Sequence, residues 1–335
     1  MPTSSKTESQ NNVKTKIGII GGAGYTAGEL LRLLINHPEV EIAFVHSTSN
    51  AGHPVTDVHG GLLGETDIVF SDTHPLDEVD VLFLCSAHGA SAKFWEENER
   101  PARLKVIDLA QDFRDESNGY VYGLPEANIE RIKTSDSVAN PGCFATAIQL
   151  SLLPLAAAGL IPADGEVNIT AITGSTGAGV KPGATTHFSW RSDNISVYKA
   201  FTHQHLAEIT RTLKQLQPDM SARLNFVPVR GDFARGIFAI THVDCPLTLE
   251  EALKLYRDYY ADAPFAVVSE RPVDLKQAVN TNKAVISLEK HGDKLLITTA
   301  EDNLLKGASG QAVQNMNIML GLDQRTGLNL KPSAF

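Results

Sequence analysis

A glycine-rich turn near the N-terminus constrains this chain more than any other feature of its sequence. The residues Gly22-Ala23-Gly24-Tyr25-Thr26-Ala27 fit the pattern G-x-G-x-x-G/A, between an apolar run at 16–20 and a helical pattern at 29–35. Glycines allow a tight turn and let the backbone approach a pyrophosphate, whose charge meets the free amides of a helix N-terminus. The pattern predicts a dinucleotide site; the alternative is a turn with a packing role only.

The end of the second expected strand indicates which dinucleotide binds. An NAD site carries an acid there to hold the ribose 2′-hydroxyl, whereas this chain has His46-Ser47-Thr48-Ser49-Asn50. Hydroxyl groups without an acid, Ser47 among them, tolerate a 2′-phosphate. NADP(H) is therefore favoured over NAD, although no arginine stands in this stretch to pair with the phosphate.

Short apolar strands alternate with helical or loop segments over the first part of the chain. Such alternation predicts an α/β fold, a Rossmann-type doubly wound parallel sheet with right-handed crossovers. Later strands are longer and closely spaced, which predicts an α+β domain with a mainly antiparallel sheet. The expected strands lie at 16–20, 40–45, 79–85 and 105–108 in the first part, and at 167–173, 223–228, 236–244, 284–291 and 294–299 in the second.

Helical patterns complete a division into two domains. They are expected at 145–158, 204–216 and 249–260, and a last helix at 308–320 returns to the first domain. We expect a disordered tail at 1–14. The first domain then consists of 15–143 and 305–335, and the second of 144–304.

Charge and cysteine content exclude several classes of function. The 335 residues carry a formal net charge of -10 with no cluster of lysine or arginine, which argues against nucleic acid or a membrane surface as a partner. The longest apolar run, 145–163, is interrupted by polar residues and reads as a core helix, so no membrane span is expected. Three cysteines without metal or disulfide spacing fit a reducing compartment. We therefore expect a cytoplasmic protein that acts on a small molecule.

Cys143 is the candidate nucleophile. The turn residues Asn140-Pro141-Gly142 precede it and a helical run follows, so its thiol lies at or next to a helix N-terminus. Free amides and the positive end of the helix dipole favour the thiolate, and the same amides can hold an oxyanion. Cys85, at the end of an apolar strand, and Cys245, before a proline, fit the ordinary buried thiol instead.

The segment Thr202-His203-Gln204-His205-Leu206-Ala207-Glu208 offers a base for this thiol. If a helix begins near Thr202, His205 and Glu208 lie on one face, where the carboxylate can orient the imidazole. His203 points elsewhere on such a helix and either meets substrate or faces solvent. His-x-His without a third ligand is a weak metal pattern, so no metal site is predicted.

A second glycine-rich loop, 174–181, follows the strand expected at 167–173 and ends in Lys181. Its Ser175, Gly177 and Gly179 can lie close to a cofactor or bind phosphate. A flexible turn between strands explains the loop equally well when it is taken alone.

A series of motifs from about residue 16 to residue 320 resembles the N-acetyl-γ-glutamyl-phosphate reductase family of arginine biosynthesis. The resemblance implies that NADPH reduces an N-acetyl-L-glutamyl 5-phosphate to the 5-semialdehyde, with release of phosphate. It also implies a Rossmann domain completed by the C-terminal helix, and an inserted α+β domain for catalysis and for the contacts of a homodimer or homotetramer. The motifs are Gly24-Tyr25-Thr26 with Glu29-Leu30, Asp112-Phe113-Arg114, Tyr122-Gly123-Leu124-Pro125-Glu126, Asn140-Pro141-Gly142-Cys143, Gly177-Ala178-Gly179, His203-x-His205 and Lys306-Gly307-x-x-Gly310-Gln311-Ala312.

The same resemblance implies roles for individual residues. It makes Cys143 the nucleophile and His205 the acid/base, with His203 and Glu208 in support. The expected cofactor-binding residues are Gly21, Gly22, Gly24, Tyr25 and Thr26 in the first turn, Ser47 after the second strand, Ser175, Gly177 and Gly179 in the second loop, and Asn303 and Gly307 before the last helix.

The sequence also departs from the family pattern. Thr48 stands where many members have arginine, so NADP lacks its usual partner residue there. Gln204 and Ala207 replace arginine and proline beside the histidines, at the expected acyl end of the substrate, which makes an N-succinyl substrate an alternative to an N-acetyl one. Aspartate-semialdehyde dehydrogenase is another alternative, although its cysteine usually follows asparagine and not glycine. From another class, a non-catalytic NADP-binding redox sensor would not need a paired histidine and carboxylate.

Overall fold

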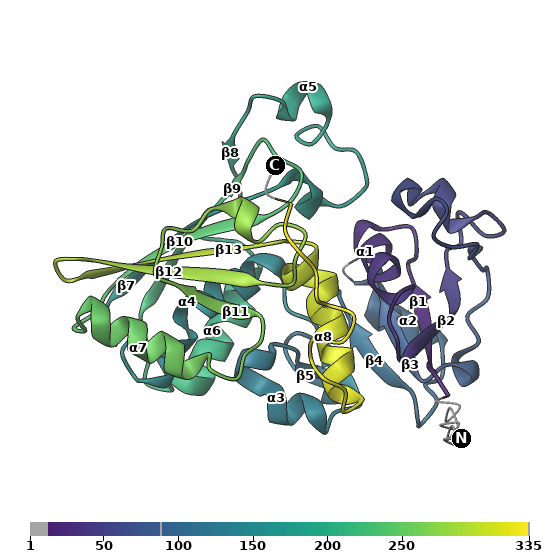
Figure 1. The fold of residues 1–335 in the computed structure, drawn as a ribbon, viewed down its shortest axis with the longest axis horizontal. Helices are drawn as coiled ribbons and strands as arrows, with labels where there is room; N and C mark the ends of the chain where they lie inside the picture. Colours follow the sequence, from purple (N-terminus) through teal and green to yellow (C-terminus); the bar gives the residue numbers. More distant parts are fainter. Residues whose placement is uncertain (1–12, 88, 334–335) are drawn as a thin grey trace, which may run out of the picture.

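The computed structural model describes residues 13–87 and 89–333. These residues form two β-sheets, one of six strands in the N-terminal part and one of seven strands in the C-terminal part (Figure 1). The α/β class predicted from the sequence is confirmed. The tail expected at 1–14 lies outside the described residues except for Val13 and Lys14, which precede the first strand.

The first sheet is parallel throughout, in the order β2-β1-β3-β4-β6-β5. Its central strands are continuous apolar runs, such as VLFL in β3, because helices cover both faces. Helices α1 and α8 pack on one face, and Phe94 and Trp95 of α2 pack on the other. The elements are β1 (Thr15–Ile20), α1 (Tyr25–Leu34), β2 (Val40–His46), β3 (Val81–Leu84), α2 (Ala90–Glu97), β4 (Lys105–Asp108), β5 (Val121–Tyr122), α3 (Pro125–Lys133) and β6 (Ser137–Ala139), with 3₁₀ turns η1 (Val55–Asp57), η2 (Gly60–Leu62), η3 (Leu76–Glu78) and η4 (Ser117–Gly119).

The second sheet is mixed, in the order β11-β12-β13-β10-β7-β9-β8. Most neighbouring strands are antiparallel, as predicted, but β7 pairs with β9 and β11 with β12 in parallel. Each parallel pair is joined by a long connection, which a parallel arrangement requires. The elements are α4 (Cys143–Ala157), β7 (Glu166–Thr173), α5 (Phe188–Arg191), β8 (Ser196–Val197), α6 (His205–Leu216), β9 (Arg223–Arg230), β10 (Ile237–Asp244), α7 (Leu249–Tyr259), β11 (Ala266–Ser269), β12 (Ala284–His291) and β13 (Lys294–Glu301), with 3₁₀ turns η5 (Ser175–Ala178) and η6 (Leu275–Gln277).

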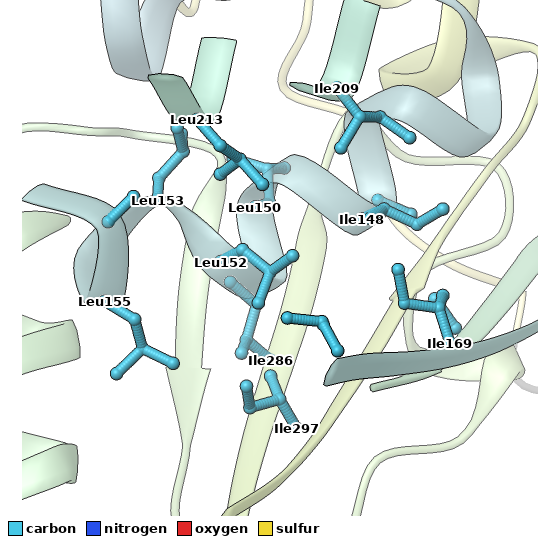
Figure 2. Close-up of a cluster of buried hydrophobic side chains, with 14 of the residues drawn as sticks. Ile148, Leu150, Leu152, Leu153, Leu155, Ile169, Ile209, Leu213, Ile286 and Ile297 are labelled. Atoms are coloured by element: carbon cyan, nitrogen blue, oxygen red, sulfur yellow. The ribbon is translucent and has the colours of Figure 1, made fainter. Parts of the chain in front are cut away.

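Helix α4 lies at the centre of the core beside the second sheet. Its sequence, CFATAIQLSLLPLAA, is apolar on almost every side, and such a helix is stable only when it is buried all round. Figure 2 shows leucines of α4 among side chains of α6 and of strands β7, β12 and β13. This packing provides a rigid base for Cys143, the first residue of the helix.

The C-terminal helix is present but starts later than expected. Residues Leu305–Ser309 form a π-helical turn, η7, and α8 covers Gly310–Met319. Such π-turns occur frequently at functional sites. Helix α8 lies between the two sheets (Figure 1), and Val313 and Met316 join the core of the first. Among the described residues, no helix has both the length and the apolar character needed to cross a membrane.

Candidate active site

Cys143 sits in a closely packed environment at the start of α4. The residue as a whole is only partly exposed, and Gly142 before it has extended backbone, with φ -71° and ψ 151°. A Cβ atom added to Gly142 would lie 2.3 Å from Nε2 of His205 and 2.7 Å from Nη1 of Arg114. The imidazole and the guanidinium therefore pack directly on the residue before the thiol, and only glycine fits between them.

Glu208 connects these groups. Its Oε2 accepts hydrogen bonds from the Tyr122 hydroxyl at 2.6 Å and from the Gly142 amide at 3.0 Å, and its Oε1 accepts one from Nη1 of Arg114 at 3.1 Å. Nε2 of His205 stands 3.8 Å from Oε1. The structure thus brings His205 and Glu208 together, but the shorter bonds of Glu208 hold the backbone that precedes the thiol.

His203 lies in the turn before α6, because that helix begins only at His205. Its ring is buried against Phe144, and its Nδ1 accepts a hydrogen bond from the His205 amide at 3.2 Å. The solvent-facing alternative for His203 is therefore wrong. Burial, with a smaller effect of two nearby cations, lowers the pKa of His203 to about 4, so the ring is neutral at pH 7. No cluster of metal-binding side chains occurs in the part of the chain that the structure describes.

The surroundings of Cys143 oppose its ionisation. Burial raises the pKa of the thiol to about 11, and the carboxyl group of Glu301 acts in the same direction. The Phe144 amide and the Arg114 guanidinium act the other way and are outweighed. The expected stabilisation of the thiolate by the helix start is therefore insufficient by itself, because taking the charge out of water costs more. The resting thiol is protonated at neutral pH and needs a base.

Alkylation of Cys143 should accordingly accelerate steeply with pH. Below a thiol pKa of about 11 the thiolate fraction rises about tenfold per pH unit, and the rate with iodoacetamide should follow it from pH 7 to pH 9. Mass spectrometry of the modified peptide measures this rate, and the Cys143→Ala variant gives the background from the other thiols. A rate that levels off before pH 8 would contradict this assignment.

Gly307 allows Glu301 to approach the thiol. A Cβ on Gly307 would lie 2.9 Å from Cβ of Cys143 and 3.0 Å from Oε1 of Glu301. Glu301 is fully buried, and neither of its carboxyl oxygens has a hydrogen-bond partner among the described residues. Burial raises the pKa of Glu301 well above its usual range, which favours the neutral acid. Gly307, expected at the cofactor, thus lies between Cys143 and a buried acid, and its lack of a side chain leaves room for both.

The first glycine-rich turn has a backbone suited to a dinucleotide. Gly21 has a φ of 79°, in the left-handed region, and a Cβ on Gly22 would lie 2.5 Å from Cγ1 of Val45. Among the described residues, no atom lies closer than 3.7 Å to a Cβ built on Gly24, and no side chain caps the start of α1. The first amides of this helix are therefore open to a ligand, which fits a pyrophosphate.

Three further residues expected to bind the cofactor are Tyr25 and Thr26, which belong to this turn, and Ser47, which follows β2. Tyr25, the first residue of α1, is 40% exposed. The carbonyl of Thr26 accepts a hydrogen bond from Oγ of Ser309 at 2.8 Å, which ties the turn to the C-terminal segment. Ser47 is buried at the end of β2, and its Oγ accepts a hydrogen bond from Nδ2 of Asn50 at 3.1 Å.

The second glycine-rich loop is held by Asn303. Nδ2 of Asn303 donates to Oγ1 of Thr176 at 3.0 Å, and its Oδ1 accepts from the Gly236 amide at 2.7 Å. Ser175 and Gly177 lie in η5, and Gly179 follows with a φ of 84°. Both ends of the Asn303 amide are bonded to protein, so this residue positions the loop.

Several residues of the site were not singled out from the sequence. Arg114 and Tyr122 belong to the quoted motifs, but nothing in the motifs indicates that both bind Glu208. His59 lies outside the motifs, and its Nε2 forms a hydrogen bond of 2.7 Å with the carbonyl of Gly22. The only sequence signal for the first two was their occurrence in a motif, and for His59 there was none.

Two family descriptions match the chain. The NAD binding domain of semialdehyde dehydrogenases matches residues 16–135, and their dimerisation domain matches residues 143–303. An aspartate semialdehyde dehydrogenase solved with NADP from Candida albicans has a TM-score of 0.71 at 17% identity, over 92% of this chain and 98% of that one. Aspartate semialdehyde dehydrogenase II from Vibrio cholerae has a TM-score of 0.70 at 17% identity, over 92% and 99%. The fold and the thiol at the start of α4 define the class of semialdehyde dehydrogenases.

Curated relatives narrow this class. The N-acetyl-gamma-glutamyl-phosphate reductase of Phocaeicola vulgatus is 61% identical over 96% of this chain and 99% of its own length. The enzymes of the same name from Parabacteroides distasonis and Christiangramia forsetii are 59% and 52% identical, over at least 95% of this chain and 99% of their own lengths. The chain belongs to the N-acetyl-gamma-glutamyl-phosphate reductase family.

Proposed function

We propose that this chain uses NADPH to reduce N-acetyl-L-glutamyl 5-phosphate to N-acetyl-L-glutamate 5-semialdehyde and phosphate, a step of arginine biosynthesis. Family membership supports the reaction. The observation that carries the chemistry is the position of Cys143 at the first residue of α4, with His205 packed on the residue before it. A thiol beside a base and free helix amides is what acyl transfer to sulfur requires.

The chemistry begins with the proton of the Cys143 thiol. His205 takes this proton, a transfer that the raised pKa of the thiol makes necessary. The sulfur then bonds to the acyl carbon, the amides at the start of α4 hold the negative oxygen, and the bond to phosphate breaks. The resulting thioester accepts a hydride at the same carbon. The C–S bond breaks to release the aldehyde, and His205 returns its proton to the sulfur.

NADPH, when bound along residues 21–26, supplies this hydride. The open amides of α1 and the acid-free end of β2 support this cofactor, since they suit a pyrophosphate and a 2′-phosphate. We assign Ser47 to the part of the site that binds the 2′-phosphate of NADPH. The second loop, with Ser175, Gly177 and Gly179, and the segment with Asn303 and Gly307 are assigned to the end that carries the nicotinamide.

The alternatives have less support. A cysteine preceded by asparagine, usual in aspartate-semialdehyde dehydrogenase, does not fit here, because any Cβ at position 142 would overlap His205 and Arg114. The solved structures of that enzyme are 17% identical to this chain, which supports a shared fold and not a shared substrate. A redox sensor would leave unexplained why Glu208, Tyr122 and Arg114 hold the backbone before the thiol.

Two cations near His203 support a second candidate, the same reaction on an N-succinyl substrate. The Arg230 guanidinium lies 4.8 Å from the centre of the Tyr198 ring, and Nζ of Lys199 donates to Oε1 of Gln204 at 3.2 Å. Both cations act on His203, and neither forms a salt bridge with a carboxylate in the described residues. One cation suits the α-carboxylate of the substrate, and the other suits a terminal carboxylate on the acyl group.

Phosphate-dependent reduction of NADP with each N-acylglutamate semialdehyde distinguishes these substrates. If Arg230 binds the terminal carboxylate, Arg230→Met should lower kcat/KM for the N-succinyl compound about ten- to hundredfold, the value of a charged hydrogen bond. The same variant should leave the N-acetyl compound within about twofold. Equal losses would assign Arg230 to the α-carboxylate that both substrates share. Parallel assays with NAD measure the cofactor preference.

We also propose a homodimer or homotetramer formed through residues 144–304, the part that we assign to catalysis and dimerisation. The matching family description names a dimerisation domain over nearly the same residues. Large apolar side chains are exposed in this part, among them Phe188 at 84% and Ile195 at 61%. Exposed apolar clusters mark interaction surfaces. The remaining residues, 15–143 and 305–335, form the proposed NADP-binding domain.

A cytoplasmic location is the last part of the proposal. Cys85, Cys143 and Cys245 are all free thiols, which fits a reducing compartment. The proposed chemistry also requires that Cys143 stay reduced.

A further inference from the structure

Arg235 joins the helix of the first glycine-rich turn to the end of the last strand. It lies between β9 and β10, and its guanidinium binds two carboxylates at once. Nη1 and Nη2 donate to Oε1 and Oε2 of Glu29 in α1, at 2.7 and 3.0 Å. Nε and Nη2 donate to Oδ2 and Oδ1 of Asp302, each at 3.1 Å. Because Asp302 is fully buried and Glu29 largely so, these bonds are well shielded from water.

The neighbours of Arg235 in the chain hold the second glycine-rich loop. The carbonyl of Ala234 accepts hydrogen bonds from the amide of Thr176 at 3.1 Å and from its hydroxyl at 2.6 Å. The amide of Gly236 donates to Asn303, whose side chain in turn donates to Thr176. The position of Arg235 therefore fixes the position of η5.

The same elements border the thiol. The strand end that carries Asp302 also carries Glu301, which approaches Cys143 across Gly307. On the other side of the loop, the carbonyl of Ser175 accepts a hydrogen bond from Nη1 of Arg230 at 3.3 Å. A shift of the strand end or of η5 would therefore change the surroundings of the nucleophile.

We propose that Arg235 is a positioning residue that couples occupancy of the first glycine-rich turn to the arrangement of the second glycine-rich loop and of Cys143. A pyrophosphate bound at the start of α1 fixes this helix and with it Glu29. The planar guanidinium of Arg235 binds Glu29 and Asp302 at once, so a fixed Glu29 also fixes Asp302. Through Ala234 and Gly236, the same arginine fixes the second glycine-rich loop. Lysine cannot replace it, because one ammonium group does not make two parallel pairs of hydrogen bonds. The proposal rests on the proposed function only in taking the turn as the cofactor site.

A cofactor fragment tests the coupling without covering the thiol. 2′-Phosphoadenosine 5′-diphosphoribose occupies the turn but carries no nicotinamide, so any effect on Cys143 must pass through the protein. At saturating fragment, the rate of Cys143 alkylation by iodoacetamide in the unaltered protein should change about fivefold or more, in the usual range of allosteric coupling. In Arg235→Lys the change should fall below about twofold, with the fragment still bound in calorimetry.

Two further variants separate coupling from a general loss of structure. Glu29→Gln removes the carboxylate of α1 that Arg235 binds. It should also abolish the change in the alkylation rate that the fragment causes. Arg32→Gln removes the other arginine that binds Glu29, at 2.8 Å, and should respond like the unaltered protein. Thermal unfolding of each variant measures stability separately. An unaltered protein that does not respond to the fragment, or an Arg235→Lys variant that responds fully, overturns the coupling. Lack of turnover with either semialdehyde would instead overturn the proposed function, because alkylation needs no acyl substrate.

Discussion

Replacing Cys143 by serine should reduce turnover about 10⁵-fold or more, the scale seen when an enzyme loses its covalent nucleophile. A serine hydroxyl at this position ionises far less readily than the thiol, so no thioester forms. His205→Asn should keep traces of activity, because a general base contributes about 10² to 10⁴ in rate. Phosphate-dependent reduction of NADP by the semialdehyde measures both variants.

Cys245→Ala provides the matched control for this prediction. Cys245 is 3% exposed, lies in the core, and is assigned no role, so its loss should leave kcat/KM within about twofold. Thermal unfolding should show that the Cys143→Ser and His205→Asn variants remain folded. A Cys143→Ser enzyme that turns over at nearly the unaltered rate would remove the nucleophile from the proposal.

The fold could be predicted wherever a pattern is long enough to be periodic. The strand expected at 105–108 coincides with β4, and the strand expected at 284–291 coincides with β12. Strands β5 and β8 have two residues each, too few for any periodicity, and only their neighbours in the sheet make them strands. Helix α6 begins within one residue of the helix expected at 204–216, whereas the alternative start near Thr202 is wrong, because His203 lies in the preceding turn and packs on Phe144.

The candidate site shows the same limit. Cys143 and the spacing of His205 and Glu208 could be read locally, since the helix start and the three-residue separation are properties of short segments. Arg114 and Tyr122 are 94 and 86 positions away from Glu208, and their bonds to it exist only in the folded chain. The effect of burial on the pKa of the Cys143 thiol could not be predicted for a related reason. Helix amides can be inferred from a turn sequence, whereas the burial that outweighs them cannot.

The largest effect on stability is expected at Lys306. Its Nζ donates to Oε1 of Glu126 at 2.7 Å and to Oε1 of Gln314 at 3.0 Å, and the paired side chains are 0% and 1% exposed. The pair ties η7 to α3 and so holds the C-terminal segment in place. Lys306→Met leaves the Glu126 carboxylate buried without its cation, which should lower the free energy of unfolding by about 3–5 kcal/mol. Urea denaturation followed by circular dichroism measures the loss.

Two controls identify burial of an unpaired charge as the cause. The double variant Lys306→Met/Glu126→Gln removes both charges and should regain much of the stability, because an uncharged pair of similar size often replaces a buried ion pair at little cost. Lys133→Met breaks an exposed pair with Glu130, whose side chains are 49% and 78% exposed. It should cost less than about 1 kcal/mol, as surface pairs do. Lys306→Met and Lys133→Met could lower the free energy of unfolding equally, or the double variant could be no more stable than Lys306→Met. Either result would show that Lys306 does not stabilise the protein by pairing with the buried charge of Glu126.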